Sequence, residues 1–147
     1  RVDCRRVLGT GRRDPLILPV LGPHSGKSLS LCAAKRPMQR RAATATIGIR
    51  GTGVYMEADP EQTYFCTCYG VADVAATKDP ESSETITALH HDRPVYITSG
   101  GQPGRNIRSA PFINHTDQEL MMIETLVGRQ PPFVFPKSDY TGPRRSY

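Results

Sequence analysis

The stretch ATATIGIRGTGVYMEADPEQTYFCTCYG, residues Ala43–Gly70, decides the fold. Apolar residues alternate with glycine and arginine at its start, and Thr63–Tyr69 is dense in aromatic residues and threonine, which favour strands. Between these parts lies Asp59-Pro60-Glu61-Gln62, which is turn chemistry because Asp favours turns and Pro fixes φ. The stretch therefore predicts a β-hairpin or meander.

Glycines divide this stretch into short strands. Gly51-Thr52-Gly53 predicts a break between a strand over 44–50 and a strand over 54–57. Gly70 predicts the end of the next strand, with Val71–Ala75 as a further short one.

The chain after residue 77 predicts two more strands between loops. Thr85–Leu89 and Pro94–Thr98 are the strand candidates, on either side of the tetrapeptide HHDR. Lys78–Ser83 reads as a polar loop, and the glycines and proline of Gly100–Ser109 predict a second loop.

A helix is predicted over Asp117–Val127. Thr116 and Glu119 form a capping box, in which each side chain satisfies a backbone donor that the helix start leaves unpaired. Apolar residues then recur at helical spacing, and Gly128 is a typical stop.

The two ends of the chain differ from its body. Residues 1–50 hold eleven basic and two acidic residues, whereas the remainder holds eight and twelve. We predict a basic irregular arm over 1–42, a β domain over 43–130 and a Pro-rich tail over 131–147. The expected fold class is mainly β: a small antiparallel meander or partial sandwich with one C-terminal helix and irregular arms.

Composition argues against several classes of protein. No apolar run approaches the roughly 18 residues of a membrane span, and no cleavage site follows an apolar core as in a signal peptide. The basic arm holds no Phe, Tyr or Trp, since the first aromatic residue of the chain is Tyr55, and this argues against nucleic-acid binding. Gly22–Ser28 resembles a phosphate-binding loop but has three residues between its glycines where four are needed.

Cysteines and histidines form the strongest chemical pattern. Cys66 and Cys68 are two apart in a predicted strand, so their thiols share one face. With His90, His91 and His115 they offer thiolate and imidazole ligands, which suit zinc or copper. These five residues are the candidate metal ligands.

The same residues have a structural interpretation. Buried free cysteine behaves as a small hydrophobe, and His115 lies where a residue packs against the first turn of a helix. Asp92 and Asp117 either orient the histidines or serve as turn and helix-start residues. No companion sequence marks either cysteine as a nucleophile, so we expect no catalytic residues and no enzyme.

The stretch TIGIRGTGVYME, residues 46–57, resembles the FecR domain. The residues that match its signature of an apolar pair around glycine, then Arg-Gly-Thr, then an aromatic residue are Ile47, Gly48, Ile49, Arg50, Gly51, Thr52 and Tyr55. The later segments CTCYG, HHDRPVYI and HTDQELMMIETLVGRQPPF resemble a bacterial subgroup of hypothetical FecR-like proteins.

The resemblance implies an all-β domain in the periplasm or elsewhere outside the cytoplasmic membrane, with a sensing or interaction role. FecR domains have several strands before this signature, so the irregular start of the chain suggests a fragment or a misassigned start. The expected function is non-enzymatic binding of a protein partner through exposed strand edges and the surface around Tyr64–Tyr69. The alternative is a zinc- or copper-binding module.

Overall fold

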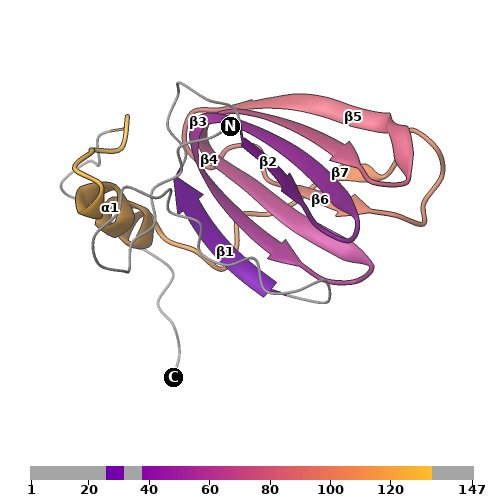
Figure 1. The fold of residues 1–147 in the computed structure, drawn as a ribbon, viewed down its shortest axis with the longest axis horizontal. Coiled ribbons are helices and arrows are strands. Elements are labelled where there is room, and N and C mark those ends of the chain that lie inside the picture. Colours follow the sequence, from indigo (N-terminus) through magenta and orange to yellow (C-terminus); the bar gives the residue numbers. More distant parts are fainter. Residues whose placement is uncertain (1–25, 32–37, 134–147) are drawn as a thin grey trace.

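The computed structural model describes residues 26–31 and 38–133, and within these the protein is mainly β (Figure 1). The described residues form one antiparallel sheet of seven strands and one C-terminal helix, as predicted. The elements are β1 (Gly26–Leu31), β2 (Met38–Arg41), β3 (Ala45–Ala58), β4 (Gln62–Ala76), β5 (Asp79–Ala88), β6 (Val95–Thr98), β7 (Ile107–Ser109) and α1 (Asp117–Leu126).

Two long strands organise the sheet, because β3 and β4 pair along their whole length and each has two further partners. The first part of β3 pairs with β2 and its last part with β1. The first part of β4 pairs with β6, which in turn pairs with β7, and its last part pairs with β5. One half of the sheet is therefore β2–β3–β4–β5, and the other is β1–β3–β4–β6–β7.

The halves meet at glycines, where the predicted strand breaks are wrong. The β3–β4 register shifts between Arg50 and Val54, so the extra residues form a bulge within a continuous strand. Gly51 and Gly70 have φ values of +60° and +91°, which glycine adopts without strain. A Cβ at Gly70 would lie 2.8 Å from the Cβ of Thr52, so the close crossing also requires glycine.

Other loop predictions are also wrong. Strands β1 and β2 lie inside the predicted irregular arm, and β5 covers most of the predicted loop Lys78–Ser83. In the described structure each of these strands pairs with β3 or β4 along one edge. Backbone hydrogen bonds to that neighbour hold the strand in place, so its sequence does not need the alternating apolar pattern on which the prediction relied. The rest of the arm, with Cys4 and Cys32, and most of the Pro-rich tail lie outside the described residues.

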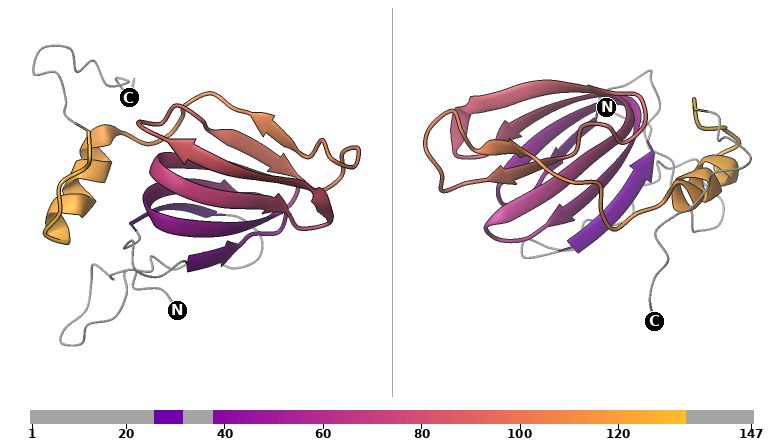
Figure 2. Two further views of the ribbon diagram at one scale, coloured as in Figure 1. Left: turned by 90° about the horizontal axis from the view of Figure 1, so that it is seen from above. Right: turned by 180° about the vertical axis from the view of Figure 1, so that it is seen from behind.

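The sheet separates two cores (Figure 2). The two halves curl toward each other (Figure 2), and the aliphatic core joins side chains of both: Ala45, Ile47, Ile49, Val54, Met56, Phe65, Ala72, Val74, Ala76, Ile86, Val95 and Ile97. The aromatic core lies on the opposite face of the β1–β3–β4–β6–β7 half: Leu31, Tyr55, Tyr64, Cys66, Cys68, Tyr69 and Leu120. Side chains alternate between the two faces within each part of β3 and β4. The bulge interrupts this period, so the neighbours Cys68 and Tyr69 both belong to the aromatic core.

Helix α1 covers the aromatic core beside β1 (Figures 1 and 2). Its start has both hydrogen bonds of the predicted capping box, and it ends at Leu126, one residue before the predicted end. Fully buried Leu120 packs against the aromatic core, where a side chain at Gly53 would lie 2.9 Å from it. The C-terminal part of the helix contributes buried Glu124, which accepts a hydrogen bond from the Tyr69 hydroxyl.

This cover corrects one expectation. The predicted partner surface around Tyr64–Tyr69 is buried, with Tyr64 and Tyr69 only 3% and 5% exposed. The reason is that β4 is an interior strand whose aromatic face is covered by α1 and the segment before it.

Candidate metal centre

Strand β4 places both body cysteines in the aromatic core. Cys66 and Cys68 are completely buried and free, and they share one face of β4 as their spacing predicts. Thr67, between them, belongs to the opposite face. Two thiols at the same depth on a rigid strand can both reach one ion.

His91 reaches the cysteines from the turn after β5. Its φ of +52° is in the left-handed region, and its backbone N–H donates to the Cys68 carbonyl oxygen over 3.0 Å. This fixes the ring so that His91 Nδ1 lies 3.5 Å from the Cys66 Sγ. A turn residue is thus held to β4 at the position of the thiols.

His115 completes the group from the segment before α1. Its ring is 1% exposed and stacks on Tyr55, with centroids 4.2 Å apart and planes at 15°. His115 Nε2 lies 3.7 Å from the Cys68 Sγ and 3.2 Å from His91 Nδ1.

These four side chains have the dimensions of one tetrahedral site. Every pair among the ligand atoms of Cys66, Cys68, His91 and His115 lies within 4.8 Å. Zinc bonds of about 2.3 Å to sulfur and about 2.0 Å to nitrogen put a sulfur and a nitrogen about 3.5 Å apart, and two nitrogens about 3.3 Å apart. The sulfur–nitrogen distances of 3.5 and 3.7 Å and the nitrogen–nitrogen distance of 3.2 Å match these edges.

Hydrogen bonds on the far side of each ring set the histidine tautomers. His91 Nε2 donates to Asp117 Oδ1 over 2.9 Å, because an ionised carboxylate only accepts. His115 Nδ1 donates to the carbonyl oxygen of Ile113 over 2.8 Å. Each ring therefore carries its proton away from the cysteines and directs a lone pair toward them, which is the usual support of metal-binding histidines.

The two thiols differ in their acid–base behaviour. A hydrogen bond from the Cys68 thiol lowers the pKa of Cys66 to about 4, whereas burial raises the pKa of Cys68. Of the two thiols, Cys66 therefore loses its proton first. A cation there would supply the charge that favours loss of the second proton, since both sulfurs bind metal as thiolates.

His90 is not one of the four. Its side chain is 45% exposed, and its Nε2 lies 2.9 Å from both oxygens of Asp117. His90, His91 and Asp117 form a second group whose ligand atoms lie within 4.8 Å of one another. The structure therefore divides the five predicted ligands into an inner set of four and His90 outside it.

The two aspartates next to the histidines have different roles. Asp117 contacts both His90 and His91, which matches the orienting role considered for it. Asp92 accepts a hydrogen bond from the backbone N–H of Leu89 over 3.1 Å, so it is a turn residue. The stacking of Tyr55 on His115 has no signal in the sequence, because it depends on the β3–β4 pairing.

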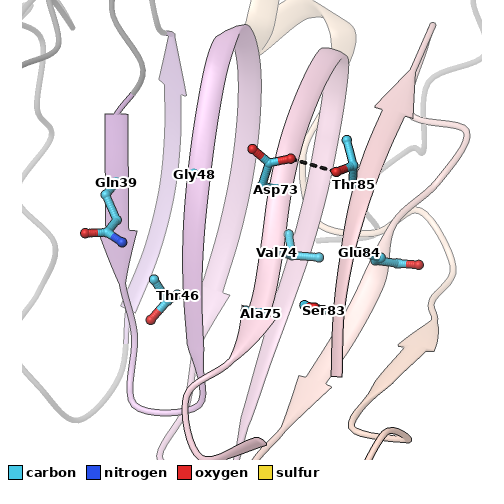
Figure 3. A pocket seen from close by; sticks show the side chains of 9 residues that line it. All are labelled: Gln39, Thr46, Gly48, Asp73, Val74, Ala75, Ser83, Glu84 and Thr85. Atoms are coloured by element: carbon cyan, nitrogen blue, oxygen red, sulfur yellow. Dashed lines mark hydrogen bonds between the residues drawn. The ribbon is translucent and has the colours of Figure 1, made fainter. Parts of the chain in front are cut away.

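The rest of the described surface offers less chemistry. Small and polar side chains line an open depression on the outer face of the other sheet half, where Asp73 accepts a hydrogen bond from Thr85 (Figure 3). The segment Gly22–Ser28, whose spacing argued against a phosphate-binding loop, falls mostly outside the described residues, and its last three, Gly26–Ser28, are part of β1. No helix in the described ranges is long and apolar enough to cross a membrane.

Comparison of the chain with protein-family models, with curated proteins and with solved structures found no match. The case for the metal centre therefore rests on its own geometry.

Proposed function

We propose that this chain is a zinc-binding β domain whose inner site is formed by Cys66, Cys68, His91 and His115. The observation that carries the proposal is the convergence of four buried ligand atoms at distances that match the edges of a zinc tetrahedron. The two histidine tautomers support it, because each ring offers a lone pair to the cluster, as a metal ligand must.

The donor set favours zinc over the other metals of soft ligands. Cu(II) prefers tetragonal sites, and blue-copper sites use one thiolate with two imidazoles. A two-iron cluster with two cysteines and two histidines binds the cysteines on one iron and the histidines on the other. Here each histidine lies within 3.7 Å of a cysteine, which fits one ion bound by all four side chains.

The ligand count favours a structural role over catalysis. Structural zinc sites have four protein ligands, whereas catalytic sites keep one position for water or substrate. The ligands are at most 8% exposed, and they come from β4, the turn after β5 and the segment before α1. A bound ion would tie these three parts together and hold α1 on the sheet.

Variants of the adjacent residues His90 and His91 test the zinc-binding proposal. The full chain, expressed with zinc and purified under reducing conditions, should contain about one zinc ion per molecule. His91→Ala and the double variant Cys66→Ser, Cys68→Ser should lose it, whereas His90→Ala should retain it at equilibrium. Because an inner variant can misfold, the wild-type chain is also unfolded by heat with and without a chelator. A zinc-free wild-type chain, or the same melting temperature with and without chelator, would contradict the proposal.

The FecR-like interaction role is a second candidate, and one observation favours it. The exposed large apolar side chains among the described residues lie on segments next to metal ligands: Leu89, Phe112, Met121, Met122 and Leu126. Such a concentration at one end of a domain is typical of a surface that binds a partner. In this interpretation zinc organises the segments that carry the partner surface.

A photo-crosslinking amino acid at position 122, in cells that express the protein natively, tests this role. We expect a specific cross-linked product that is absent when the same amino acid stands at position 85, on the outer face of β5. Equal labelling from the two positions would contradict an interaction surface at α1.

A further inference from the structure

We propose that His90 and Asp117 form an outer, solvent-facing site for a divalent cation, through which the ion reaches the inner site. This inference rests on the zinc-binding function proposed above, and it assigns a role to the candidate ligand that the tetrahedron does not use.

Burial restricts how a metal ion can reach the inner site. Both inner cysteines are completely buried and His115 is 1% exposed, so an ion cannot meet these three ligands directly from solvent. His91, at 8%, is the most exposed of the four. Entry from the His91 side thus requires the least displacement of packed side chains.

On the His91 side, hydrogen bonds link His90, Asp117 and His91. His90 is 45% exposed, Asp117 is 14% exposed, and the side chain of His91 is 6% exposed. His90 Nε2 lies 2.9 Å from both Asp117 oxygens, and Asp117 Oδ1 lies 2.9 Å from His91 Nε2. The other ring nitrogen of His91 faces the thiols. Hydrogen-bonded imidazole and carboxylate groups therefore extend from the solvent to His91, whose Nδ1 is a ligand atom of the inner site.

The outer and inner sites differ in the ligands that they offer to an ion. One imidazole and one carboxylate, completed by water, bind a divalent ion weakly and release it readily. Two thiolates and two imidazoles form a complete and softer set that holds zinc more tightly. An ion bound outside replaces the proton between His90 Nε2 and Asp117, and that proton passes to solvent or to the other ring nitrogen. When the ion moves inward, His90 regains a proton from solvent, and the protons still held by the two thiols pass to solvent as the sulfurs bind the ion.

The backbone makes the arrangement specific. Consecutive side chains in a regular strand point to opposite faces. The left-handed conformation of His91 breaks this rule, so His90 and His91 both reach the same carboxylate. Asp117 is held at the first position of α1, next to the cap residue Thr116.

Cobalt(II) loading of the full metal-free chain tests the proposal, because cobalt bound by thiolates absorbs where the free ion does not. Capture followed by transfer predicts a wild-type loading rate that levels off as cobalt concentration rises. His90→Ala should load roughly tenfold more slowly at low cobalt and without levelling off, and should reach the same final spectrum.

Two control variants separate ligation from other effects. His90→Gln keeps a hydrogen-bond donor to Asp117 but loses the imidazole, and it should load as slowly as His90→Ala. Asp73→Asn removes one negative charge from the outer face of the other sheet half, and it should load like the wild type.

The failures of the two proposals are distinguishable. A wild-type chain without the thiolate–cobalt band contradicts the zinc-binding function itself. A wild-type chain with the band, and both His90 variants loading at the wild-type rate, overturns the outer site alone. His90→Gln loading at the wild-type rate while His90→Ala is slow also overturns it, since His90 would then only position Asp117.

Discussion

The two cores of this protein lie on opposite faces of the same two strands and differ in kind. The aliphatic core consists of side chains that interact only by packing, and it includes fully buried Ile47, Ile49 and Ile86. The aromatic core combines two leucines with tyrosines and thiols whose polar atoms need partners, and His91 and His115 contact its cysteines. Hydrophobic burial can maintain the first core alone, whereas the second depends on satisfied polar contacts and, in our proposal, on a metal ion.

The two cores differ in how they hold their elements. Backbone ladders join the strands around the aliphatic core. Among the described residues no ladder joins α1 to the aromatic face, so side chains attach the helix. The turn at His91 has a backbone hydrogen bond to the Cys68 carbonyl oxygen, and its other attachments are made by side chains. The attachments at the helix are Leu120, the Tyr69–Glu124 hydrogen bond and the ion pair of Glu124 with Arg129 at 3.0 Å. A bound ion would be the strongest of these attachments. The comparison suggests a scaffold on one face and a site on the other.

The largest expected effect comes from the aliphatic core. Phe65 is 1% exposed, and Phe65→Ala should lower the free energy of unfolding by about 3–5 kcal/mol because it removes packing and leaves a cavity. The loss should be the same in zinc-loaded and chelator-treated protein, as measured by denaturant unfolding. The volume-conserving Phe65→Leu should cost less than about 1.5 kcal/mol. A loss that depends on zinc by more than about 1 kcal/mol would show that the two cores are coupled.

The next effect concerns the aromatic side only. Asp117→Asn removes the carboxylate that orients His91, and it should lower zinc affinity roughly 10–100-fold, or about 1.4–2.7 kcal/mol. Competition with a chromogenic chelator measures the affinity. Unfolding of the zinc-free variant should stay close to that of the zinc-free wild type. Unchanged affinity would mean that the hydrogen bond to Asp117 does not fix the orientation of His91.

The sequence predicts the scaffold better than the attachments, for physical reasons. Alternation in Ala43–Gly70 reflects a local period, so it identifies β3 and β4 and places Cys66 and Cys68 on one face. The capping box is equally local, and it gives the start of α1 correctly. Strands β1 and β2 lack such a signal, because they exist through pairing with β3.

The site depends on features that no short pattern encodes. The sequence does not distinguish His90 from His91 as a ligand. In the structure the left-handed backbone conformation of His91 directs its ring, and not that of His90, to the cysteines. The meeting of Cys68 with His115 spans 47 residues and depends on how the segment before α1 crosses the sheet. Residue types therefore predicted a candidate metal site, whereas only the three-dimensional structure selects the four side chains that we propose as its ligands.

A third prediction concerns the hydrogen bonds of Asp79 at the start of β5. Asp79 accepts hydrogen bonds from Ser82, Asn106 and the backbone of Gly104, and the bond from Ser82 is the largest cause that lowers its pKa to about 2. A lowered pKa gives stability that is present above about pH 4 and is lost as pH falls toward 2. Asp79→Asn should therefore be less stable than the wild type at neutral pH, and the difference should shrink on acidification, with or without zinc. A constant difference from pH 7 to pH 2 would contradict this origin.

The smallest effect belongs to the outer polar face, which faces neither core. Asp73 pairs with Arg50 at 2.5 Å, but their side chains are 37% and 63% exposed. Solvent screens such pairs, so Arg50→Ala should change the free energy of unfolding by at most about 1 kcal/mol. That change should decrease further at high salt. Zinc content and zinc affinity should not change, because the sheet and the aliphatic core separate this pair from the metal centre. A drop in zinc affinity on Arg50→Ala would show that the sheet transmits strain between its faces, and the separation of scaffold and site would then be wrong.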